Sequence, residues 1–116
     1  MIRRSLEADV MAVLWDDPTP RRVRDVLNRL NADRDRPLAY TTVMTVLNRL
    51  VEKGSAVRHP DGRGYRYTAS APDEAGLAVR GVLARHGDAA VAGFLTELQA
   101  DPDLRQRLRR VLDEGN

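Results

Sequence analysis

A five-residue turn sequence, PDGRG at positions 60–64, constrains the fold of this 116-residue chain more than any other segment. It separates two segments of strand composition, residues 56–59 and 65–68. A short glycine-rich turn between two such segments is a strong signal for an antiparallel β-hairpin. The rest of the chain carries helical patterns, so we expect a mostly α-helical protein with one small hairpin.

Three helical patterns precede the hairpin. In each, apolar residues recur every three or four positions, which is the period of an amphipathic helix. Ser5 is expected to cap the first helix, Thr19 and Pro20 to open the second, and Thr41 to lie near the start of the third. Gly54 is expected to end the third helix in the left-handed conformation. The predicted buried stripes are Leu6, Val10, Val13 and Leu14, then Val23, Val26, Leu27 and Leu30, then Val43, Val46, Leu47 and Leu50.

Three helices followed by a hairpin is the element order of a winged helix-turn-helix. Beyond the hairpin, further helical patterns cover residues 75–85, a segment that Asp88 is expected to cap, and a segment opened by Asp101 and Pro102. Small residues and a proline at 69–72 separate these helices from the hairpin. We therefore divide the chain into a winged-helix domain, residues 1–70, and a helical region, residues 71–116.

The charge is distributed unevenly along the chain. Residues 1–70 hold 13 Arg or Lys against 9 Asp or Glu, a net charge of +4, whereas residues 71–116 hold 6 against 8, a net charge of −2. A basic front half and an acidic back half are typical of a headpiece that binds a polyanion and carries a separate interaction segment. The pattern favours a nucleic-acid partner.

Composition also narrows the setting and the chemistry. The chain has no cysteine, so it offers no disulfide, no thiolate metal site and no thiol nucleophile. Neither a signal-peptide core nor a membrane span is recognisable, and we expect a cytoplasmic protein with no membrane partner. His59 is expected in a strand and His86 at a helix end, and no nucleophile and base set is evident. We predict no enzyme, metal or cofactor.

The third predicted helix carries a polar face opposite its apolar stripe. Threonine offers a hydroxyl for a phosphate or base edge and a methyl for thymine, and asparagine can bind adenine through two hydrogen bonds. Three threonines within five residues are poor choices for helix stability. The simplest alternative is an ordinary solvated surface. We interpret four residues of this face as DNA base contacts: Thr41, Thr42, Thr45 and Asn48.

Several arginines are placed to bind phosphate. Arg63 stands between two glycines at the hairpin tip, where a guanidinium group can lie along a phosphate or enter the minor groove. Arg21, Arg22 and Arg24 fall in the expected first turns of the second helix, where the helix dipole disfavours cations and an external anion would help. The predicted phosphate contacts are Arg21, Arg22, Arg49, Arg63 and Arg66.

Residues 39–50, AYTTVMTVLNRL, continue through Glu52, Lys53 and Gly54 and closely resemble the BlaI/MecI family of penicillinase repressors. The similarity extends over about residues 5 to 100, and only the last helix matches loosely. This resemblance implies a winged-helix repressor whose third helix reads a palindromic operator of the TACA/TGTA type. It also implies that the C-terminal helices form a homodimer and that repression follows from occluding a promoter.

The resemblance further implies release by a sensor-linked protease that cuts the dimerisation helices, often at an Asn-Phe bond. The corresponding pair in this chain is Gly93 and Phe94, which departs from that motif. Copper-responsive relatives carry a cysteine-rich C-terminal metal motif. This chain lacks one, so copper sensing is not expected.

The C-terminal helices hold more apolar residues than some 45 residues of short helix can bury alone. A second chain could cover them, or they could pack on the headpiece. The predicted dimerisation residues are Leu77, Val82, Val91, Phe94, Leu95, Leu98, Leu108 and Leu112. The function predicted is a DNA-binding repressor. The alternatives are a winged-helix protein-interaction module that binds no DNA and, less favoured, a small hydrolase.

Overall fold

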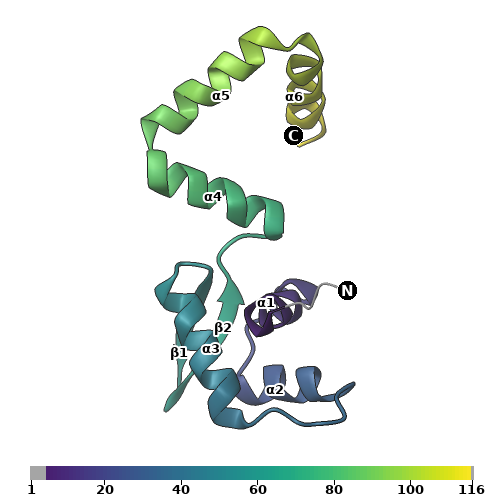
Figure 1. The fold of residues 1–116 in the computed structure, drawn as a ribbon, viewed down its shortest axis with the longest axis vertical. Helices are drawn as coiled ribbons and strands as arrows, with labels where there is room; N and C mark the ends of the chain where they lie inside the picture. Colours follow the sequence, from purple (N-terminus) through teal and green to yellow (C-terminus); the bar gives the residue numbers. More distant parts are fainter. Residues whose placement is uncertain (1–4, 116) are drawn as a thin grey trace. The chain divides into compact units, whose positions relative to one another are not determined.

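The computed structural model describes residues 5–115 (Figure 1). The chain divides into two compact units, the first ending at Leu77 and the second beginning at Ala78. In the described residues the elements follow in the order α1 (Leu6–Asp16), α2 (Val23–Asn31), α3 (Tyr40–Glu52), β1 (Ala56–Asp61), β2 (Gly64–Ala69), α4 (Glu74–His86), α5 (Asp88–Ala100) and α6 (Pro102–Glu114).

The first unit is built from α1, α2, α3 and the hairpin around one apolar core. Val10, Val26, Val43 and Leu47 are fully enclosed, and the remaining predicted stripe residues are buried or packed against this core. Burial of apolar surface is the main force that holds such elements together. The winged helix-turn-helix fold predicted from the sequence, mostly helical with one small hairpin, is confirmed.

Several predicted helix ends are confirmed by their hydrogen bonds. The Ser5 hydroxyl accepts a hydrogen bond from the backbone N–H of Ala8 at 3.1 Å, which caps α1. The Asp101 carboxylate accepts from the N–H groups of Asp103 and Leu104, and Pro102 is the first residue of α6. These side chains satisfy N–H groups that have no partner inside the helix.

The predicted start of the second helix was wrong. Thr19 and Pro20 lie outside α2, because Arg21 is extended and pairs with Tyr67 of β2 through two backbone hydrogen bonds of 3.0 and 2.7 Å. Arg22 is the N-cap residue, and its N–H donates to the Asp25 carboxylate at 2.9 Å. Pairing with the sheet is more favourable here than an earlier helix start, so Arg21 and Arg22 precede the first turn.

The predicted cap of α5 was also wrong. Asp88 is the first helical residue, and the N-cap is Gly87, which has a φ of 55° that a side chain would disfavour. A sharp change of direction between α4 and α5 requires this glycine. Asp88 instead places a negative charge in the first turn, where the helix dipole favours it.

The hairpin is tighter than the sequence suggested. β1 and β2 pair in antiparallel register from Ala56 opposite Ala69 to Asp61 opposite Gly64, so the strands extend into the predicted turn and only Gly62 and Arg63 connect them. Gly62 has a φ of 64°, as the first position of a type II′ hairpin turn requires. Gly54 has the predicted left-handed conformation, with a φ of 81°.

The segment after the hairpin is held by the first unit. The Trp15 indole N–H donates to the carbonyl of Ala71 at 3.0 Å, and Leu77 packs against the core. These contacts extend the first compact unit beyond the predicted domain boundary at residue 70.

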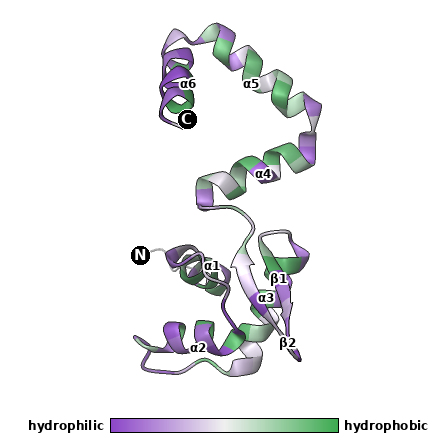
Figure 2. Cartoon of the chain, turned by 180° about the vertical axis from the view of Figure 1, so that it is seen from behind, coloured by the Kyte–Doolittle hydropathy of each residue, from purple (hydrophilic) through white to green (hydrophobic). Residues whose placement is uncertain are grey.

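In the second unit, α5 and α6 contact each other, and none of their described residues is fully buried. Figure 2 shows apolar residues along α5 and a largely polar α6. Among the described residues, no helix is long and apolar enough to cross a membrane.

We expect Leu47→Ala to lower the free energy of unfolding of the first unit by about 2 to 5 kcal/mol, because it leaves a cavity at a fully enclosed site. Urea unfolding followed by Trp15 fluorescence would measure the loss. Met44→Ala on the same helix is the matched control, since Met44 is 36% exposed. Equal losses for the two variants would contradict the core described above.

Candidate nucleic-acid interface

The outward face of α3 presents the predicted threonines. Thr41, Thr42, Thr45 and Arg49 are exposed, and they line one side of a hollow whose other side is the N-terminal end of α1. The buried stripe on the opposite face of α3 is the cause, since a helix that turns about 100° per residue must expose what lies across from its buried positions. The structure thus brings these four residues together on one surface.

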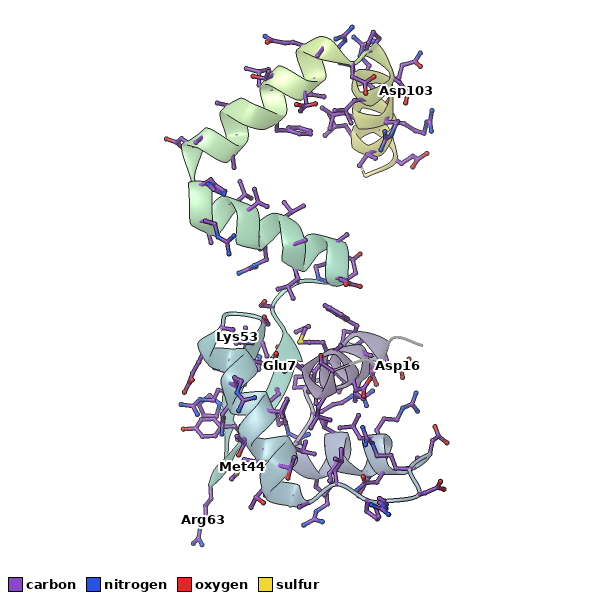
Figure 3. All side chains as sticks on the ribbon, in the orientation of Figure 1. Glu7, Asp16, Met44, Lys53, Arg63 and Asp103 are labelled. Carbon is purple, nitrogen blue, oxygen red and sulfur yellow. The ribbon has the colours of Figure 1, made fainter. Side chains whose placement is uncertain are left out.

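An ion pair fixes the C-terminal end of this helix. The Lys53 ammonium group donates to both carboxylate oxygens of Glu7, at 2.8 and 2.9 Å, and joins the end of α3 to α1 (Figure 3). Lys53 is thereby partly neutralised. Glu7 also lines the hollow beside the threonines, so this ion pair lies at the edge of the threonine face.

Asn48 is held differently from the threonines. It is half-buried, and its Oδ1 accepts a hydrogen bond of 3.0 Å from the hydroxyl of Tyr67 in β2. Burial raises the pKa of Tyr67 above its ordinary value, so this hydroxyl keeps its proton at neutral pH and remains a donor. A two-bond contact between Asn48 and adenine would have to share Oδ1 with Tyr67.

Arg63 projects from the tip of the hairpin (Figure 3). It is exposed, as is Arg49 on α3. Within the described residues, no ion pair joins either side chain to a carboxylate. Their guanidinium groups are therefore available to an external anion.

The other three predicted phosphate contacts are paired within the chain. Arg21 lies 3.4 Å from Asp17, and its side chain is only 17% exposed. Arg22 and Arg66 share Oδ2 of Asp61, at 2.7 and 2.5 Å. The hydrogen bond from Arg66 is the main reason that the pKa of Asp61 is lowered, and attraction by both arginines adds to it.

Sequence reasoning missed an aromatic and basic cluster between α2, α3 and the hairpin. The Arg24 guanidinium lies 5.1 Å from the centre of the Tyr40 ring, and Arg58 lies 4.3 Å from that of Tyr65. Tyrosines interleaved with arginines were visible in the sequence, but only the hairpin register shows which of them share a face. The hollow at this place is lined by Arg22, Val23, Arg24, Tyr40, Met44, Arg63, Gly64, Tyr65 and Tyr67.

Of the two histidines, His59 lies in β1, where its ring hydrogen-bonds with the Thr68 hydroxyl at 3.0 Å, and His86 is the last residue of α4. Both histidines lie in the elements expected from the sequence, a strand and a helix end.

The predicted dimerisation residues divide into three groups. Leu77 packs on the core of the first unit, whereas Leu98 and Leu108 are half-buried in α5 and α6. The third group holds the most exposed apolar side chains, each about half exposed: Val82, Val91, Phe94, Leu95 and Leu112.

The predicted cleavage position, Gly93 and Phe94, lies in the middle of α5, not in a loop.

One protein family and its curated relatives match most of this chain. The family model described as "Penicillinase repressor" matches residues 5–114. The transcriptional regulator BlaI of Mycobacterium tuberculosis, in two strains, is 43% identical over 117 residues, which cover 94% of this chain and 81% of the relative.

Among solved structures, the monomeric form of Bacillus licheniformis BlaI in complex with the blaP half-operator aligns with a TM-score of 0.49 and 28% identity. The alignment covers 65% of this chain and 87% of that one. The family match spans nearly the whole sequence, and the mycobacterial relative matches over most of its own length. The chain therefore belongs to the penicillinase repressor family.

Proposed function

We propose that this chain is a sequence-specific DNA-binding repressor that acts as a homodimer on a palindromic operator of the TACA/TGTA type. The observation that carries the proposal is the exposed threonine face of α3 beside a hairpin whose tip carries Arg63, which forms no ion pair within residues 5–115. A helix of this kind fits the major groove, and a hairpin tip can reach the adjacent backbone. The relatives are named as repressors or transcriptional regulators, which supports the same function.

In this proposal the contacts fall into two classes. Thr41, Thr42 and Thr45 read base edges, with Asn48 contributing the part of its amide that Tyr67 does not occupy. Arg49 and Arg63 bind phosphates first, because neither is paired with a carboxylate in the described chain. The phosphate contacts provide affinity for any duplex, whereas the base contacts distinguish the operator. Arg21, Arg22 and Arg66 join once their carboxylates are displaced.

The homodimer is supported by the second unit. Its helices leave several large apolar side chains about half exposed, and a second copy would remove them from water. A two-fold dimer presents two recognition helices to two half-sites related by the same symmetry. Occupying both half-sites would occlude a promoter in the cytoplasm, without a cofactor.

Release by a sensor-linked protease would require a local change in α5. Gly93 and Phe94 are helical, and a protease binds an extended segment, so α5 would have to open locally before cleavage. Gly93 lowers helix stability at this place, which favours such opening.

The test of the proposed function is a titration of labelled TACA/TGTA palindrome and of a scrambled duplex at two salt concentrations. We expect strong preference for the palindrome, two chains bound per duplex, and affinity that falls steeply as salt rises. Weak and equal binding to both duplexes would contradict the proposed operator. A salt-independent affinity, or no binding to either duplex, would favour the protein-interaction module.

Thr45→Ala should weaken binding to the operator by about 1 to 3 kcal/mol and leave binding to the scrambled duplex nearly unchanged, because it removes one base contact. Fluorescence anisotropy on both duplexes measures the two losses. Thr96→Ala is the matched control, since Thr96 is an exposed helical threonine in α5. Equal losses on both duplexes would assign Thr45 to phosphate instead.

Phe94→Asp should yield monomers and lower operator affinity through the loss of two-site binding, because a charge would be placed in an apolar contact between copies. Sedimentation velocity measures the mass, and thermal unfolding shows whether the headpiece remains folded. Thr96→Asp adds a charge at a polar position of the same helix and should remain dimeric. A folded, dimeric Phe94→Asp variant would exclude Phe94 from the interface.

A further inference from the structure

We propose that Asp61 determines specificity, by occupying two arginines that would otherwise bind the phosphates of any duplex. The inference rests on the proposed function and extends it. The carboxylate lies at the end of β1, immediately before the two-residue hairpin turn. In the free protein it takes the place that a DNA phosphate would have between Arg22 and Arg66.

The geometry joins three segments at one oxygen. Oδ2 of Asp61 accepts from Nη2 of Arg22, at the start of α2, and from Nε of Arg66, in β2. Nη1 of Arg66 also donates to the carbonyl of Pro20 at 3.4 Å. Guanidinium groups bind carboxylate and phosphate oxygens through the same donors, so a phosphate can replace this carboxylate without rebuilding the site.

The cluster lies at the surface and is open to exchange. The side chains of Arg22, Asp61 and Arg66 are 46%, 39% and 39% exposed. Exposed ion pairs contribute little to folding stability, because water screens them. A structural role alone therefore gives a weak reason for a carboxylate beside the DNA-facing hairpin.

The same surface carries arginines without such a carboxylate. Arg24 lies over the Tyr40 ring and Arg63 extends from the hairpin tip, and within the described residues no ion pair joins either to an acidic side chain. Arg22 lines the same hollow but is paired with Asp61. Arg24 and Arg63 can therefore attract any duplex. Arg22 and Arg66, which are paired with Asp61, can bind a phosphate only after close docking.

When a phosphate replaces the carboxylate, the ion pairs of Asp61 with Arg22 and Arg66 are lost. The negative charge of Asp61 then lies unpaired beside the DNA. On a scrambled duplex this cost is not offset by base contacts. On the operator, the contacts of α3 hold the backbone close enough for exchange. Asp61 therefore lowers nonspecific affinity more than operator affinity and raises the ratio between them.

The experiment compares Asp61→Asn with the wild-type chain on the palindrome and the scrambled duplex, over a series of salt concentrations. Asparagine has nearly the size of aspartate and leaves Gly62 in place at the turn, and circular dichroism would check the fold. We expect scrambled-duplex affinity to rise roughly three- to tenfold and its slope in log salt to steepen by about 1 to 2, as one or two phosphate contacts are added. The gain on the operator should be smaller.

A second comparison separates this mechanism from simple repulsion. In an Arg22→Ala/Arg66→Ala background the gain from Asp61→Asn should vanish, since no guanidinium remains to be released. Asp103→Asn is the matched control, because it removes one carboxylate that pairs with Arg107 in α6, and it should change neither affinity.

Three results would overturn the inference: an undiminished gain in the arginine-free background, no gain from Asp61→Asn at all, or a loss confined to the operator. A wild-type chain that binds neither duplex would instead overturn the proposed function, and the inference with it.

Discussion

The burial of one stripe of α3 is the interaction on which the rest of this structure depends. Val43 and Leu47 are fully enclosed by the core that α1, α2 and the hairpin complete. Once those positions are buried, the rotation of the helix is determined, and Thr41 and Thr45 must face outward. The same apolar packing that stabilises the headpiece therefore creates the surface proposed to read DNA.

Tyr67 connects that helix to the hairpin. Its backbone pairs with Arg21, its ring is buried in the core, and its hydroxyl donates to Asn48. One residue of β2 thus links the segment before α2, the hairpin and α3. A hairpin held in this way can act with α3 as one rigid surface, which would limit the entropy lost in the proposed contact with DNA.

The second unit has a different physical character. Its helices are amphipathic or apolar, yet none of their described residues is fully buried. Short helices gain most of their stability from packing against other elements. Within the second unit, the helices bury too little of their apolar surface against one another. This incomplete burial is the physical reason to propose a second copy. The negative net charge of residues 71–116, in contrast to the basic headpiece, also fits a segment that contacts protein and not DNA.

The sequence by itself determined the features that depend on local spacing. Apolar residues at helical intervals predicted the stripes of α1, α2 and α3. Ser5 and Asp101 predicted the caps of α1 and α6, and Gly62 predicted the turn, because each signal involves residues within a few positions of one another. The threonine face of α3 followed from the same periodicity.

Only the tertiary structure decided the features that join distant parts of the chain. Arg21 is extended because it pairs with Tyr67, so α2 starts later than the sequence signal suggested. Arg22 meets Asp61 across 39 positions, and that contact decides which arginines are free to bind an anion. Spacing along a sequence cannot reveal such pairs, because the distance between them is fixed by how the helices and hairpin pack around the core.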